Sequence, residues 1–88
     1  MILEFRESFH KDLKKINEKG LLNKVRRFIE LAEKAESLSE LPEIKKLAGN
    51  AYYFRLRLGN YRLGFMSRGK VLIFIRILHR KDIYRYFP

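Results

Sequence analysis

Cysteine is absent from the 88-residue chain, which excludes disulfide bonds, thiolate catalysis and cysteine-based zinc sites. Long apolar runs are missing too, since the longest, from Val71 to Ile75, is far too short to span a bilayer. The N-terminus carries no signal-peptide pattern, so we expect a cytoplasmic protein that does not enter a membrane. The chain has no proline, serine or glutamine tract of the kind that indicates disorder. Its 88 residues suffice for one hydrophobic core. The sequence therefore predicts a single domain spanning residues 1–88.

Several common catalytic arrangements are also missing. Two isolated histidines and one late aspartate lack the spacing of metal ligands, so we expect no metal site. No serine or threonine sits in a nucleophile elbow, no glycine-rich phosphate loop is present, and no cofactor is expected. These absences leave charge and aromatic side chains as the carriers of any chemistry.

Acidic residues are scarce in the second half of the chain. The whole chain has 20 Lys and Arg against 10 Asp and Glu, a net charge of +10. Residues 1–50 hold 11 basic and 9 acidic residues, net +2, whereas residues 51–88 hold 9 and 1, net +8. The second half has 7 Arg and 2 Lys, and arginine is suited to bidentate phosphate contacts. This distribution predicts an anion site in the C-terminal half, with nucleic acid or an acidic protein as the partner.

Hydrophobic periodicity predicts an α+β fold with the element order β-α-α-β-β-β. Residues 1–6 are a candidate first strand. Ser8 is expected to cap a first helix and Gly20 to end it, and a second helix is expected from about Leu21 to Glu36. The stretch 37–50 carries turn formers and predicts the connection between the helical hairpin and the strands.

Strand periodicity begins at residue 51. Residues 51–58 alternate, which puts Phe54, Leu56 and Leu58 on one face of a strand. Gly59-Asn60 predicts a two-residue hairpin turn into a strand over 61–67, and residues 71–78, apolar on both faces, predict a central strand. We expect these strands to form an antiparallel meander, followed by a short helical turn in the tail. The register across residues 68–70, and with it the face of Arg76, stays open.

A two-residue turn at Gly59-Asn60 would place Arg55, Arg57 and Arg62 on one face of the sheet. Like charges directly opposite each other on neighbouring strands cost about 0.2–1 kcal/mol, and Asp82 is the only acid after Glu43. A solvated sheet face is the simpler interpretation. An anion site explains the concentration of arginines better, because tyrosines that can stack on the bases of single-stranded RNA accompany them. These tyrosines are Tyr53, Tyr61, Tyr84 and Tyr86.

The run IKKLAGNAYYFRLRLGNYRLGF and the terminal VLIFIRILHRKDIY, together with the order of elements, resemble the RelE/ParE superfamily of type II toxin-antitoxin toxins, and archaeal-type RelE in particular. The resemblance covers nearly the whole chain. It implies a ribosome-dependent endoribonuclease, an mRNA interferase, that cuts mRNA in the A site by metal-independent attack of the RNA 2′-hydroxyl. It also implies the ribosome, mRNA and an acidic antitoxin protein as partners.

The resemblance also implies roles for particular residues. Arg62 matches the family arginine that stabilises the transition state, and Arg55 falls where RelE has a catalytic lysine. Tyr53 falls where RelE has a second lysine, so the chain departs from that pattern and the general base stays open. His79 is a candidate on chemical grounds, because histidine can exchange a proton near neutral pH, although a lone histidine is more often a structural or surface residue. The residues expected to take part in catalysis are Arg55, Arg62, His79, Arg80 and Tyr84. Those expected to bind RNA are Tyr53, Arg57, Tyr61 and Tyr86.

Two other functions stay open at this point. A ParE-type toxin would share the fold but inhibit DNA gyrase without cutting RNA. A non-catalytic basic domain would bind RNA in a salt-sensitive manner and release no product.

Overall fold

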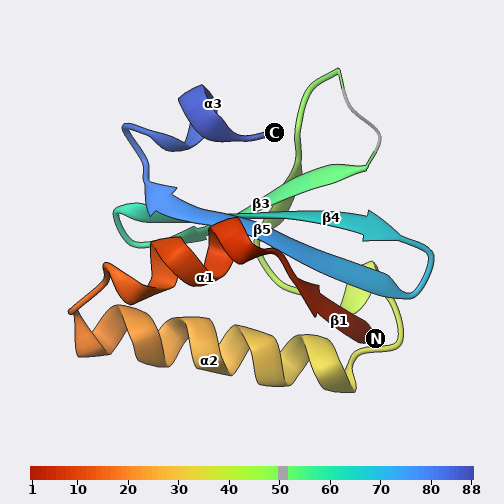
Figure 1. Cartoon of the computed structure of the whole chain (residues 1–88). Coiled ribbons are helices and arrows are strands. Elements are labelled where there is room, and N and C mark those ends of the chain that lie inside the picture. The colour runs from red at the N-terminus through yellow and green to blue at the C-terminus, as the bar shows by residue number, and fades with distance from the viewer. Residues whose placement is uncertain (50–51) are drawn as a thin grey trace.

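A computed structural model describes residues 1–49 and 52–88 (Figure 1). Its elements are β1 (Ile2–Phe5), α1 (Glu7–Lys14), α2 (Lys19–Lys34), the 3-10 turn η1 (Leu38–Glu40), β2 (Ile44–Lys46), β3 (Tyr53–Leu58), β4 (Tyr61–Arg68), β5 (Val71–His79) and α3 (Ile83–Tyr86). The strands form one sheet in the order β1-β5-β4-β3-β2, with β1 parallel to β5 and the other neighbours antiparallel. The α+β prediction is confirmed. None of the helices within the described residues has the length and apolar character needed to cross a membrane.

The main core lies between one face of the sheet and helix α2. Phe28 of α2 contacts Phe65 and Phe74, with ring centroids 6.0 and 6.1 Å apart. Leu56 and Leu63 are buried in the same cluster, as the strand alternation predicted. The buried residues of α2 recur along one stripe of the helix: Leu21, Val25, Phe28 and Ala32.

Helix α1 closes an open edge of strand β5. Because β1 pairs only with Val71–Phe74, no strand among the described residues lies beside the later part of β5 on that side. The Ser8 hydroxyl donates a hydrogen bond to the Ile75 carbonyl at 2.6 Å, and the Asp12 carboxylate accepts one from the Ile77 N–H at 3.1 Å. From Ser8 to Asp12 the helix rises about 6 Å, and from Ile75 to Ile77 the strand rises about 6.6 Å. The two helix side chains are therefore spaced like the two backbone groups of β5 that they bind.

Two of the predicted helix signals are wrong. Ser8 lies in the first turn of α1 rather than at its N-cap, which is Arg6, because the Ser8 hydroxyl is used by β5. Gly20 does not end the first helix: α1 ends at Lys14, and Gly20 lies in the first turn of α2. The helical hairpin itself is confirmed.

Strand β2 lies in the stretch that was predicted to be a connection only. It pairs Ile44–Lys46 with Phe54–Leu56. Three residues, two of them lysines, give no recognisable alternation, so the strand is defined by its partner rather than by its own sequence. The strand predicted over 51–58 begins at Tyr53, and residue 51 lies outside the described residues.

The hairpin register is confirmed, since Leu58 pairs with Tyr61 and Arg57 with Arg62. Gly59 has a φ of 60°, a conformation that a two-residue hairpin turn requires and that glycine adopts without strain.

A bulge in β5 determines the face of Arg76. The second turn has two residues, because Arg68 pairs with Val71, and that register alone would bring Ile75 opposite Gly64. The pairing slips by one residue at this point, so that Gly64 pairs with Arg76 instead. Arg76 therefore emerges on the same face of the sheet as Gly64.

The C-terminal tail covers the face of the sheet opposite to α1 and α2 (Figure 1). Ile83 is fully buried, and the Phe87 ring is buried against Gly64, so closely that a Cβ on that glycine would lie 2.7 Å from it. The ring of Tyr53 meets Phe87 edge-on, with centroids 5.5 Å apart. The predicted helical turn is confirmed as α3.

Candidate functional site

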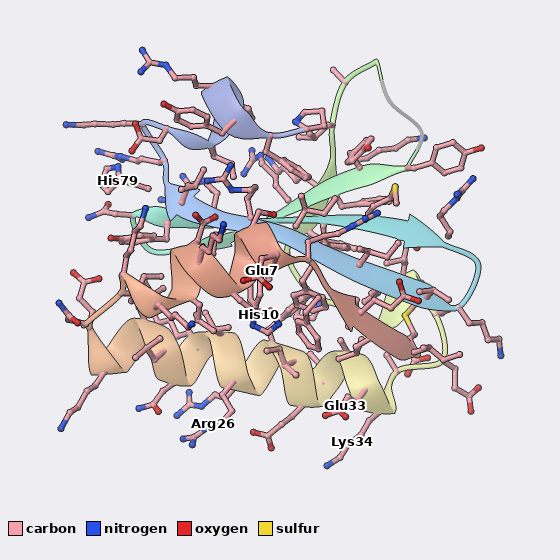
Figure 2. The ribbon with its side chains drawn as sticks, viewed as in Figure 1. Glu7, His10, Arg26, Glu33, Lys34 and His79 are labelled. Carbon is pink, nitrogen blue, oxygen red and sulfur yellow. The ribbon has the colours of Figure 1, made fainter. Side chains whose placement is uncertain are left out.

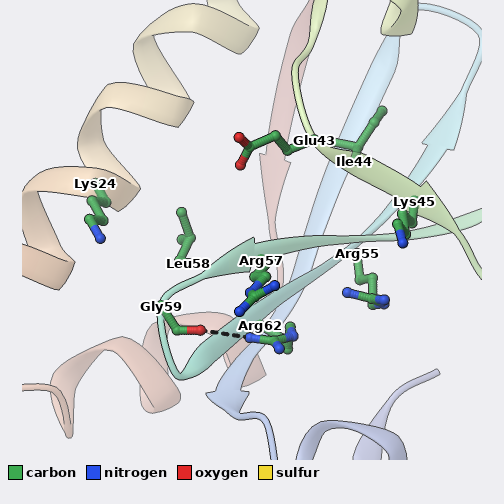
Figure 3. A pocket seen from close by; sticks show the side chains of 9 residues that line it. All are labelled: Lys24, Glu43, Ile44, Lys45, Arg55, Arg57, Leu58, Gly59 and Arg62. Carbon is green, nitrogen blue, oxygen red and sulfur yellow. Dashed lines mark hydrogen bonds between the residues drawn. The ribbon is translucent and has the colours of Figure 1, made fainter.

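The central feature of the site is a set of three arginines, Arg55, Arg57 and Arg62, which we call the arginine cluster. Arg57 and Arg62 are direct cross-strand partners, and Arg55 lies two residues from Arg57, so all three emerge on one face of β3 and β4. Figure 3 shows their guanidinium groups on the same side of the hairpin. Within residues 1–49 and 52–88 a single ion pair occurs, between Arg76 and Asp12, so no carboxylate neutralises the cluster.

An open pocket of about 660 Å³ adjoins the arginine cluster. It lies beside the first residues of β2, where β3 continues past Leu56 toward the Gly59 turn, and all three arginines line it. Lys24 of α2 and Lys45 of β2 add two further positive charges to its wall. Glu43 also lines the pocket, but in Figure 3 its carboxylate points away from the arginines. The pocket is therefore suited to an anion with several charges.

Arg62 is oriented by the backbone of its own hairpin. One terminal nitrogen, Nη1, donates hydrogen bonds to the carbonyls of Gly59 at 2.8 Å and Tyr61 at 2.9 Å. Burial lowers the pKa of Arg62, and the positive charges of Arg57 and Arg55 lower it further. The guanidinium nevertheless keeps its proton at neutral pH. An anion bound here would relieve the repulsion that lowers this pKa.

Two predicted catalytic residues of the tail lie in the electrostatic neighbourhood of Arg62. Tyr84 raises the pKa of Arg62 and Arg80 lowers it. The Tyr84 side chain is 60% exposed although it follows the fully buried Ile83, so α3 packs through Ile83 and leaves the Tyr84 ring accessible. Arg80 and Tyr84 therefore lie near enough for their charges to act on Arg62, on the face of the sheet that the tail covers.

The other predicted tyrosines are divided between the two faces. Tyr53 lies on the face of the arginine cluster, where its ring contacts Phe87. Tyr86 is half exposed, and its ring lies over the guanidinium of Arg76. Tyr61 precedes Arg62 in β4 and therefore points to the helix side of the sheet, where it packs against the core.

His79 lies apart from the arginine cluster. Figure 2 shows His79 at the end of β5. It pairs with Tyr61, which points to the helix side of the sheet, and the two rings meet edge-on with centroids 5.6 Å apart. Its Nδ1 accepts a hydrogen bond from the Lys81 N–H at 3.2 Å, which leaves the proton of the neutral ring on Nε2. In this geometry His79 faces away from the group that the arginines would bind, and its Nε2 is a donor rather than a base.

Three residues of this region were missed by sequence reasoning. Lys24 reaches the pocket from a helix about 30 residues earlier in the sequence, and no local pattern marks it. Lys45 pairs with Arg55 across β2 and β3, so recognising β2 would have found it. Asp12 pairs with Arg76, 64 residues away.

Candidate metal ligands do not gather anywhere in the part of the chain that the structure describes, where no group of three His, Asp or Glu side chains could hold an ion. The chemistry that the described side chains can perform at the arginine cluster is charge stabilisation by guanidinium groups and hydrogen bonding or stacking by tyrosines.

Comparisons with known proteins concern the family and the fold of the chain. A family model described as the ParE toxin of type II toxin-antitoxin system, parDE, matches residues 3–84. The chain is 44% identical over 86 residues to Toxin RelE3 of Methanocaldococcus jannaschii, and the match covers 96% of each protein.

Two solved structures share the fold. The RelB-RelE antitoxin-toxin complex from Methanococcus jannaschii contains a chain that matches with a TM-score of 0.83 and 40% identity, over 97% of this chain and 99% of that one. A chain of the archaeal RelE-RelB complex from Pyrococcus horikoshii OT3 matches with a TM-score of 0.72 over 93% and 97% of the two chains. At 21% identity, this second match supports the fold alone.

Proposed function

Because this chain belongs to the ParE/RelE family of toxins from type II toxin-antitoxin systems, we propose that it is a ribosome-dependent endoribonuclease that cuts mRNA in the A site. The observation that carries the proposal is the arginine cluster, with Arg80 and Tyr84 beside it and no carboxylate paired to it within the described residues. A gyrase inhibitor has no evident need for such a site, whereas RNA cleavage needs a strong anion site next to an accessible aromatic ring.

The reaction assigned to this site is internal transfer at a phosphodiester. The 2′-oxygen of the ribose attacks the adjacent phosphorus in line and loses its proton, and the bond from phosphorus to the 5′-oxygen of the next nucleotide breaks. That 5′-oxygen takes up a proton, so the products are a 2′,3′-cyclic phosphate and a free 5′-hydroxyl. Metal independence is part of the proposal, because Arg62 can stabilise the extra negative charge on the phosphoryl oxygens and Arg55 can assist it.

Proton transfer is assigned to the face of the sheet that carries the arginines. Tyr53 and Tyr84 are the hydroxyl-bearing candidates there, and Tyr84 also has an exposed ring that can stack on a base. Arginine is a poor acceptor because it rarely releases its proton. His79 is given no role in the reaction, because it lies on the other side of the sheet.

An acidic antitoxin protein is the proposed regulatory partner. The solved relatives are complexes of a RelE toxin with a RelB antitoxin, and a net charge of +10 suits an acidic binding segment. Occupation of the arginine cluster by antitoxin carboxylates would neutralise the site and block RNA at the same time.

Primer extension on mRNA bound to translating ribosomes tests the nuclease proposal. We expect new 5′ ends with the wild-type protein, and a loss of at least about 10²-fold in cleavage rate for Arg62→Ala, the usual scale for removing one charge-stabilising donor. Arg26→Ala is the matched control, because this arginine lies on the outer side of α2 and donates only to Asn23 within the described structure (Figure 2).

Inhibition of gyrase supercoiling is the second function to be tested, since the matching family model is that of the ParE toxins. Supercoiling inhibition without new mRNA ends would replace the nuclease proposal. RNA binding without either activity would leave a basic RNA-binding domain.

A further inference from the structure

Arg76 differs from the arginine cluster on the same face of the sheet because its charge is already paired with a carboxylate. Its Nε and Nη2 donate to the two carboxylate oxygens of Asp12, at 2.7 and 2.9 Å. The Asp12 side chain is only 4% exposed and also accepts the hydrogen bond from Ile77. Asp12 raises the pKa of Arg76 through this hydrogen bond, and burial opposes the shift. Arg76 is therefore held rigidly and has little charge left for an RNA phosphate.

The remaining face of the Arg76 guanidinium supports the tail. Its central carbon lies 5.5 Å from the centroid of the Tyr86 ring, which is within the range of a cation–π contact. Tyr86 is the last residue of α3, and Arg80 and Tyr84 lie just before it in the same tail. A planar group fixed at the edge of β5 thus contacts the segment that carries two candidate site residues.

We infer that the Asp12–Arg76 pair is a positioning device that holds Tyr86, and through it α3, which carries Tyr84, on the face of the sheet that bears Arg62. The inference rests on the proposed function for its consequence in catalysis, but the positioning itself is a property of the free protein. Ile83 and Phe87 anchor the tail by burial, and the Arg80 N–H anchors its start by donating to the Asn60 carbonyl at 2.7 Å. The contact between Arg76 and Tyr86 adds an anchor at the last residue of α3.

This inference gives Tyr86 a different role from the one expected from the sequence. As an RNA-binding residue, Tyr86 would stack on a base, and its loss would weaken substrate binding without changing the free protein. As a positioning residue, it acts through Arg76 before any RNA is present. The two roles therefore predict different results for the same variants, in substrate binding for the first and in the free protein for the second.

Hydrogen exchange of residues 80–88 in the full-length free protein, measured by mass spectrometry, tests the positioning directly. Tyr86→Leu removes the ring, and we expect exchange in this segment to accelerate about two- to fivefold, the factor that corresponds to a partly exposed cation–π contact. Tyr86→Phe retains the ring and should match the wild type in exchange. Arg85→Gln changes a neighbouring exposed residue of α3 and is the control.

Kinetics with ribosome-bound mRNA supply the second measurement. Tyr86→Leu is expected to lower kcat by about tenfold at an unchanged KM, because displacement of α3 by a fraction of an ångström misplaces Tyr84. Arg76→Lys keeps a positive charge beside Asp12 but loses the planar fork, and it should loosen the tail as well. If Tyr86 acts through Arg76, the double variant should be no worse than the more affected single variant.

Three results would overturn the inference. One is unchanged tail exchange in Tyr86→Leu with a raised KM, which would make Tyr86 a direct RNA contact. Another is accelerated exchange throughout the chain, which would make the pair a general stabilising element. The third is wild-type behaviour of Tyr86→Leu in both measurements. Accelerated tail exchange in a protein that cuts no RNA at all would leave the positioning intact and refute the nuclease proposal instead.

Discussion

Gly64→Ala is expected to dislodge the tail from the sheet. An ideal Cβ on Gly64 would lie 2.7 Å from the Phe87 ring, whereas ordinary contacts begin at 3.4 Å, so the ring must withdraw by at least about 0.7 Å. Loss of the Phe87 contact costs about 1.5–3 kcal/mol, and overpacking it in place costs about 1–3 kcal/mol. The free energy of unfolding should fall by about 1–3 kcal/mol in either case, with Tm lowered by about 4–8 °C per kcal/mol.

Thermal unfolding and mRNA cleavage together check this prediction. The protein should stay folded but lose most of its cleavage activity, because Gly64 lies outside the main core and contacts the segment that carries Tyr84. Gly20→Ala is the matched control: apart from its chain neighbours and the adjoining helix backbone, nothing described lies within 4 Å of its Cβ position. Alanine favours a helix, so stability should be unchanged or raised by up to about 1 kcal/mol. In the Gly64→Ala background, Phe87→Leu should cost less than in the wild type. A Gly64→Ala protein with wild-type Tm and cleavage would show that Phe87 does not hold the tail.

The remaining predictions concern charge, hydroxyl groups and the buried ion pair. Arg57→Ala should reduce the slope of log affinity for single-stranded RNA against log salt by about 0.7, whereas Arg26→Ala should leave it unchanged, as a salt titration would reveal. Tyr84→Ala should abolish cleavage. Tyr84→Phe should also lose cleavage if the hydroxyl is essential, and should retain it if Tyr84 acts by stacking on a base. His79→Gln should cut ribosome-bound mRNA at nearly the wild-type rate, and a slow variant would return His79 to the site. Asp12→Ala should lower the free energy of unfolding by about 2–3 kcal/mol in urea titrations, less than for a fully buried pair because the Arg76 side chain is 24% exposed.

Features that depend on nearby residues could be predicted from the sequence. The hairpin at Gly59 follows from a two-residue turn signal between alternating segments, and it fixes Arg57 opposite Arg62. The position of β5 inside the sheet, between β1 and β4, follows from apolar residues on both of its faces, since the tail covers the face that the helices leave open. In both cases the residues that form the sequence pattern are also the residues that make the turn or pack in the core.

Features that depend on distant residues could not be predicted in this way. Ser8 has the chemistry of a helix cap, but its hydroxyl is used by Ile75, 67 residues later, because the open edge of β5 competes for it. The side of the sheet on which Arg76 lies depends on the bulge opposite Gly64. No residue in the neighbouring turn predicts that bulge. His79 looked like a member of the site because it precedes Arg80, yet its side chain belongs to the other face.

The arginines of the exposed sheet face therefore fall into two kinds, and the difference supports a division of labour. Arg76 is compensated by a buried carboxylate, which removes it from the anion site and makes it a fixed support. Arg57 and Arg62 face each other without compensation, an arrangement that costs about 0.2–1 kcal/mol of stability. Asp12 lies on α1 at the far edge of β5, two strands away from the β3 residue Arg57, and no described carboxylate pairs with the cluster. The repulsion between Arg57 and Arg62 does not stabilise the fold. A bound phosphodiester would relieve that repulsion, and the free energy released would add to its affinity for the site.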